Sequence, residues 1–167
     1  IALNKLFPKL RVLVVGDGIL KDQLLTKLEN NHVDFHFAGF LDQNTLFEYY
    51  AKSKLFLFTT MDDVWGIVAN EACASGTPVI TSKDAGVAGE LVVHNRNGYV
   101  LPYDVSIWVS HILNLLHDQQ LLSNFSNQSI NLVKQYNHQQ AADGLIDAVN
   151  YAIGDKNRLP QDNPIIS

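Results

Sequence analysis

The sequence predicts an α/β protein with a doubly wound parallel sheet that is capped by helices at its C-terminal end. Short apolar runs alternate with amphipathic stretches over the first hundred residues, and only helical periodicity follows residue 105. Two of the runs, 12–15 and 55–58, are apolar on both faces. Interior strands of a parallel sheet require this because both of their faces are covered. Strands that alternate with helices build a doubly wound fold.

The individual elements follow from apolar spacing. We expect strands at 11–15, 34–37, 55–58, 78–81 and 99–101, joined in one parallel sheet. Helices are expected at 19–30, 44–53 and 67–74, and three more are marked by apolar residues within 105–116, 122–132 and 142–153.

The two ends of the chain lack the alternation of strands and helices that its middle shows. Apolar residues from Leu3 to Leu10 have helical spacing until Pro8 interrupts it, which is typical of the end of a helix. We therefore expect an α/β domain over 1–153 that begins with the tail of a helix whose start lies upstream of Ile1. Residues 154–167 contain two prolines and no periodicity, and they are interpreted as a tail.

Composition excludes several classes of protein. Of the 167 residues, 47% are hydrophobic and only 17% are charged, which is typical of a folded chain rather than a disordered one. The net charge of -5 argues against binding to nucleic acid or to anionic lipid. The single cysteine, Cys73, has no disulfide partner and no zinc spacing, which predicts a buried packing thiol in a reducing, cytoplasmic protein. No apolar run approaches the ~20 residues that span a bilayer.

Ligands of open parallel sheets bind beyond the carboxyl ends of the strands, so the loops that follow strands are the places to search. The first such loop, Gly16-Asp17-Gly18, begins like a dinucleotide fingerprint, but Lys21 stands where the third glycine would fall. A simple turn and a phosphate site both remain open for this loop. A further loop, 85–90, follows the strand at 78–81 and faces the same edge.

The loop at 61–66 opens the helix that contains Glu71. Free N–H groups at the start of a helix, with the positive end of its dipole, form a site for a diphosphate, and Gly66 lets an anion approach closely. Glu71 lies about one turn inside this helix, where its carboxylate can accept both hydrogens of a vicinal diol such as that of ribose. A solvated glutamate on an ordinary helix is the alternative interpretation.

The stretch DVWGIVANEACASGTPV at 63–79 resembles the nucleotide-sugar-binding C-terminal domain of retaining GT-B glycosyltransferases of the family 4 type. It is similar to that family's pattern of two acidic residues separated by seven others, followed by Gly-Thr-Pro-Val. Supporting matches are the Gly16–Gly18 turn, residues 37–40, residues 86–90 and Asn97-Gly98. The resemblance covers about residues 6–153 and implies the Rossmann-like half of a GT-B fold.

The resemblance also implies roles for particular residues. Glu71 would bind the ribose hydroxyls of a nucleoside diphosphate sugar, and the backbone at Gly66, Ile67 and Val68 would meet the diphosphate or the sugar. The glycines of the first loop, Gly16 and Gly18, would belong to the same donor site, and Gly39 and Phe40 would border the base. Asp63 stands where the family has its first glutamate, near the donor sugar, and with Glu71 it forms the expected catalytic pair. Trp65 would wall the sugar pocket or pack inside the domain.

The implied activity is retaining transfer of a sugar from a nucleoside diphosphate carrier to a hydroxyl acceptor, with no metal and no cofactor besides the donor. Asp63 is one methylene shorter than glutamate, which leaves open a noncatalytic sugar-nucleotide-binding or scaffolding relative, and a UDP-sugar epimerase of the same fold is a further alternative. In the family, an arginine and a lysine on the first strand-loop-helix unit of the domain neutralise the diphosphate. These residues match nothing in this sequence, so the resemblance implies that this unit lies upstream of Ile1. We therefore expect the N-terminal GT-B domain of the same full-length protein as partner, and any peripheral membrane association would occur only through that domain. We also expect the chain alone to be inactive.

Overall fold

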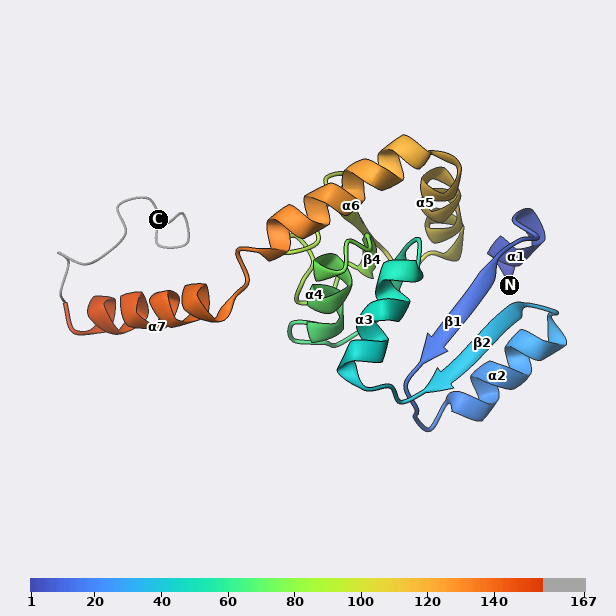
Figure 1. Ribbon diagram of the computed structural model, residues 1–167, viewed down its shortest axis with the longest axis horizontal. Coiled ribbons are helices and arrows are strands. Elements are labelled where there is room, and N and C mark those ends of the chain that lie inside the picture. The colour runs from blue at the N-terminus through green and yellow to red at the C-terminus, as the bar shows by residue number, and fades with distance from the viewer. Residues whose placement is uncertain (155–167) are drawn as a thin grey trace.

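The structure, a computed structural model, describes residues 1–154 (Figure 1). Twelve elements are formed in this part of the chain: α1 (Ala2–Leu6), β1 (Arg11–Val15), α2 (Lys21–Asn30), β2 (Asp34–Gly39), α3 (Gln43–Lys52), β3 (Phe56–Phe58), α4 (Ile67–Ala74), β4 (Val79–Ser82), β5 (Gly98–Leu101), α5 (Val105–His117), α6 (Gln119–Val133) and α7 (His138–Ala152). All five predicted strands are present, and the α/β class is confirmed. The predicted tail, apart from Gly154, lies outside the described residues.

Every strand pairing is parallel, but the strands form two sheets rather than the single predicted one. β1 pairs with β2, and β3, β4 and β5 pair in that order. β1 lies on the side of its pair that faces the three-stranded sheet (Figure 1). The prediction of one continuous sheet is wrong because β1 does not pair with β3, and each of these strands has one edge without a partner strand among the described residues.

The hydrophobic core lies on both faces of β4, and this strand is buried over its whole length. Successive side chains of a strand point to opposite faces, so Val79 and Ile80 enter different clusters. Val79 packs with residues of α3 and α4, and Ile80 packs with residues of α5. Helices therefore cover both faces of the three-stranded sheet. By contrast, only Leu28 and Val33 are buried around β1 and β2.

Polar caps set the starts of the later helices. The carboxylate of Asp118 accepts a hydrogen bond from the Leu121 N–H, and the Asn137 side chain accepts one from the Gln140 N–H. Such caps satisfy N–H groups that have no partner inside the helix. α6 and α7 consequently begin three and four residues before the first apolar positions that predicted them, 122 and 142.

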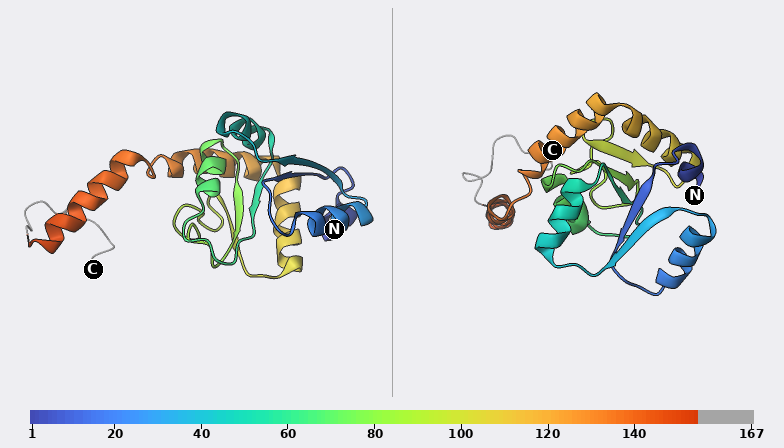
Figure 2. Two further views of the ribbon diagram at one scale, coloured as in Figure 1. Left: turned by 90° about the horizontal axis from the view of Figure 1, so that it is seen from below. Right: turned by 45° about the vertical axis from the view of Figure 1, so that its right-hand side comes forward.

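α5 and α6 pack on the domain as predicted, but α7 does not. α7 extends away from the body of the protein (Figures 1 and 2). Its apolar residues are exposed: Leu145 is 67% exposed, and Ile153, just beyond its end, is 71% exposed. The predicted cap is therefore wrong for this helix, because the turn at 134–137 directs it outward. Among residues 1–154, no helix has the length and apolar character needed to cross a membrane.

Candidate functional site

The loops after β1 and β2 meet at the carboxyl edge of their strands. The Gly16 N–H donates to the Gly39 carbonyl oxygen at 2.7 Å, which brings two of the predicted site residues together. Phe40 follows directly and is 81% exposed. An exposed aromatic ring beside two glycines offers a flat apolar surface next to accessible backbone.

The rest of the first loop is occupied by its own side chains. The Gly18 N–H donates to Asp17 Oδ1 at 2.8 Å, and Lys21 Nζ lies 3.3 Å from Asp17 Oδ2 and 4.6 Å above the centre of the Phe37 ring. The Gly18 N–H, and secondarily Lys21, hold the pKa of the Asp17 carboxyl below its usual value. The Gly18 N–H thus already has an acceptor, as the simple-turn interpretation expects.

The start of α4 carries free backbone donors. Gly66 precedes the helix in a left-handed conformation with φ 85°, and a Cβ there would lie 2.5 Å from the Phe58 ring, so glycine is required. The N–H groups of residues 66–68 have no acceptor within the described part of the chain. Ile67 is 71% exposed, so this helix start is open to solvent. It can bind an anion through its N–H groups and the helix dipole.

Asp63 fixes the loop that leads into this helix. Its Oδ1 accepts a hydrogen bond from the Trp65 N–H at 3.0 Å, and its backbone carbonyl accepts one from the Gly86 N–H at 2.9 Å. The Trp65 ring is half-buried and lies 5.1 Å from the Tyr136 ring, which corresponds to the packing alternative. The Asp63 carboxylate thus has a local role in the turn, with one oxygen free of partners among the described residues.

Glu71 lies on the second turn of α4 and is half-buried. Its carboxylate forms no hydrogen bond or ion pair within residues 1–154. Burial, and secondarily the negative charge of Glu71, raises the pKa of Tyr50 to about 12. Tyr50 therefore stays neutral near Glu71, and no described cation neutralises this carboxylate. An unpaired, half-buried carboxylate can accept hydrogen bonds from ligand hydroxyls.

Contacts between loops that the sequence did not predict hold this edge together. The Thr60 carbonyl oxygen accepts hydrogen bonds from Ser82 Oγ and from the Tyr103 hydroxyl, the latter at 2.7 Å. Together with the contact between Gly86 and Asp63, these bonds join the loops that follow β3, β4 and β5. Tyr103, whose hydroxyl joins two of these loops, was not predicted, although it lies two residues beyond the end of β5. The exposed Lys83 likewise follows a strand end, that of β4.

The predicted site residues thus form two groups at the carboxyl ends of the strands. Gly16, Gly39 and Phe40 lie at the ends of β1 and β2. Asp63 and the start of α4 follow β3 in the chain. No hydrogen bond joins the two groups in the part of the chain that the structure describes. That part also contains no cluster of three or more His, Cys, Asp or Glu side chains arranged to hold a metal ion.

In open parallel α/β folds, ligands bind in the crevice beyond the carboxyl ends of the strands, where both groups of residues lie. The sequence model of the glycosyl transferases group 1 family matches residues 1–132, and the chain belongs to this family. It is 29% identical, over 116 residues, to a sulfoquinovosyl transferase of Arabidopsis thaliana. That match covers 68% of this chain and 22% of the length of the plant protein.

Solved structures share the fold of this chain. The C-terminal domain of a glycosyl transferase group 1 family protein from Francisella tularensis superposes with a TM-score of 0.71 at 26% identity, over 80% of this chain and 73% of that domain. The HepE protein of Anabaena, in complex with UDP-glucose, superposes with a TM-score of 0.72 at 24% identity, over 83% of this chain and 41% of HepE.

Proposed function

We propose that this chain binds the nucleoside diphosphate sugar donor of a glycosyltransferase that moves the sugar, with retention, to a hydroxyl acceptor. The observation that carries the proposal is the open start of α4, where free N–H groups at 66–68 lie one turn before the unpaired carboxylate of Glu71. Membership of the glycosyl transferases group 1 family and the likeness to HepE, which was solved with UDP-glucose, support a nucleotide-sugar ligand.

Each feature of the site has a part in this reaction. The N–H groups at 66–68 bind the diphosphate and stabilise the negative charge that it gains as leaving group. Glu71 accepts hydrogen bonds from the two ribose hydroxyls and so orients the donor. Gly39 and Phe40 border the base, and the free carboxylate oxygen of Asp63 faces the donor sugar. Catalysis in this scheme is positioning together with charge stabilisation, and it requires no metal.

The proposal includes further polypeptide that completes the sheet and the cleft. β1 and β3 are each an edge strand of their sheet, and a parallel strand that paired with both would unite the two sheets. Of the cations at this edge, Lys21 is bound to Asp17, which leaves Lys83 and whatever a partner domain supplies. A second domain would also exclude water and provide the acceptor site.

The role of Glu71 can be tested by Glu71→Gln in the intact protein. Loss of a charge-assisted hydrogen bond costs about 1.5 to 3 kcal/mol, so the dissociation constant of UDP or GDP is expected to rise roughly ten- to a hundredfold. Titration calorimetry measures this change, and circular dichroism checks that the fold is retained. Glu48→Gln is the matched control, because Glu48 is an exposed glutamate on α3 that pairs with Lys52. Equal affinities for Glu71→Gln and the wild-type protein would refute the assignment.

Asp63→Ala tests whether this residue serves the sugar or only the turn. If it contacts the donor sugar, turnover with the full donor falls while the affinity for free UDP or GDP barely changes. Similar losses in both measurements would assign Asp63 to the turn alone, since its Oδ1 already accepts the Trp65 N–H. Turnover of the wild-type protein separates an enzyme from the noncatalytic alternative. A product that forms without any acceptor would indicate the epimerase.

A further inference from the structure

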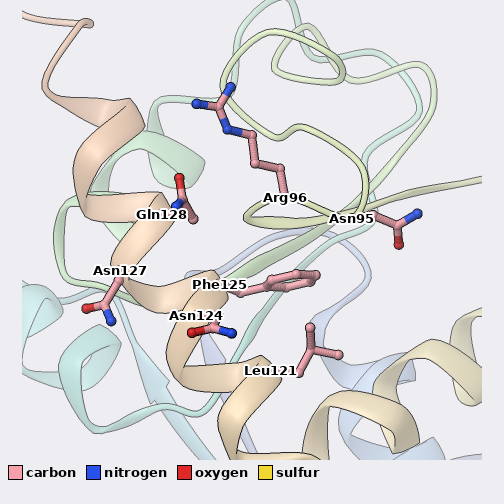
Figure 3. A pocket seen from close by; sticks show the side chains of 7 residues that line it. All are labelled: Asn95, Arg96, Leu121, Asn124, Phe125, Asn127 and Gln128. Atoms are coloured by element: carbon pink, nitrogen blue, oxygen red, sulfur yellow. The ribbon is translucent and has the colours of Figure 1, made fainter.

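A cavity lies at the amino edge of the three-stranded sheet, opposite the proposed donor site. It has a volume of about 620 Å³ and is formed between α6 and the turn that precedes β5 (Figure 3). Its polar lining consists of four amides and one guanidinium, those of Asn95, Asn124, Asn127, Gln128 and Arg96, above the buried ring of Phe125. Since β5 starts here and the donor loops follow strand ends, the two sites lie at opposite edges.

The chemistry of the cavity is unusual for a protein surface. α6 contains no charged residue over its fifteen positions, although its solvent face would ordinarily carry several. None of the five polar side chains has a hydrogen-bond partner within the described part of the chain. The cavity therefore offers unused amide donors and acceptors, with Arg96 as its only charge and no carboxylate in its lining.

The two walls of the cavity are fixed to each other. Ser129 Oγ donates to the Asn97 carbonyl oxygen at 3.2 Å and so joins the two walls, and Ser126 Oγ donates to the Gly76 carbonyl oxygen at 2.6 Å, which fixes α6 to the turn before β4. The buried Asn97 side chain holds its own loop, because it accepts from the Val93 N–H and donates to the Leu91 carbonyl oxygen. A ligand would thus meet walls that are already ordered, which reduces the entropic cost of binding.

We propose that this cavity binds a saccharide of a few pyranose rings. Every sugar hydroxyl is both a donor and an acceptor, and each amide supplies one group of each kind, while Arg96 can donate two parallel hydrogen bonds to neighbouring hydroxyls. A single cation among neutral amides does not suit a polyanion, and the lack of carboxylates does not suit a cation or a basic peptide. The volume lies within the ~300–1,000 Å³ of small-molecule sites. The proposal stands independently of donor binding.

Titration of the protein with maltotriose and with chitotriose tests the proposal. The side-chain NH₂ signals of Asn124, Asn127 and Gln128 are expected to shift in a saturable manner in NMR spectra with at least one of the two. Both Arg96→Ala and Asn124→Ala are expected to raise the dissociation constant at least ~5-fold, because each removes hydrogen bonds from an exposed side chain. Gln120→Ala is the matched control, since Gln120 is exposed on the same helix but does not line the cavity.

Three outcomes would overturn the proposal. The first is the absence of saturable shifts with either saccharide up to roughly 20 mM, because a site of this size is expected to bind in the millimolar range or better. The second is that Arg96→Ala and Asn124→Ala both bind the saccharide with the same dissociation constant as the wild-type protein. The third is displacement of the saccharide by UDP, which would place it in the donor site at the other edge.

Discussion

Gly98→Ala is expected to lower the free energy of unfolding by about 3 kcal/mol, the upper end of the usual cost of overpacking a core. Gly98 begins β5 opposite Val79 of β4, and a Cβ at this position would overlap the Val79 carbonyl oxygen and press on a Val92 methyl group. Neither neighbour can move easily, because the carbonyl belongs to the buried central strand and Val92 is fully buried. Urea denaturation followed by circular dichroism measures the change.

The control for Gly98→Ala is the same substitution at Gly144. Gly144 lies within α7, where an added Cβ meets no atom within 4 Å and alanine is the better helix former. Gly144→Ala is therefore expected to leave the unfolding midpoint unchanged or slightly higher. A midpoint for Gly98→Ala that equals that of the wild-type protein would contradict the close pairing of β4 with β5.

Gly86→Ala is expected to weaken UDP or GDP binding by more than tenfold in the intact protein. Its Cβ would overlap the Val64 carbonyl oxygen, and its N–H donates to the neighbouring Asp63 carbonyl, so the side chain would push away the loop that leads into α4. Misplacement of the N–H groups at 66–68 removes several contacts with the diphosphate at once. Calorimetric titration with the nucleotide gives the size of the effect.

Thermal unfolding of Gly86→Ala distinguishes a displaced loop from a lost fold. If only the loop moves, the variant keeps its cooperative transition while losing affinity. Gly144→Ala again serves as the control, because Gly144 lies in the middle of α7, which extends away from the body of the protein, and its added Cβ meets no atom within 4 Å (Figure 1). Full affinity in folded Gly86→Ala would show that the loop at 61–66 does not position the ligand.

The strands and most helices were predictable because their signals are local. Apolar runs mark β1 and β3 within two residues of their bounds, and the spacing from Ile67 to Ala74 gives α4 at both ends. The starts of α6 and α7 were missed because capping residues such as Asp118, rather than apolar residues, determine them. The division into two sheets was also missed, since strand pairing depends on which segments meet in space.

The same difference between local and long-range signals applies to the candidate site. Gly66 and Glu71 are five residues apart on one helix, so their relation followed from helical geometry alone. The contacts of Thr60 with Ser82 and Tyr103 join loops that are more than twenty residues apart in the chain, and no local pattern encodes them. The cavity beside α6 likewise required the fold, because its two walls are distant in sequence.

The division of the strands into two sheets has a consequence for thermodynamic linkage. The unit built on β1 and β2 buries only Leu28 and Val33, so it should open locally at a lower free energy than the body around β4. A nucleotide held between Phe40 and the start of α4 would touch both units and bind only when both are closed. By mass action it would then suppress the local opening of the weaker unit, so ligand affinity and the closure of that unit become one coupled equilibrium.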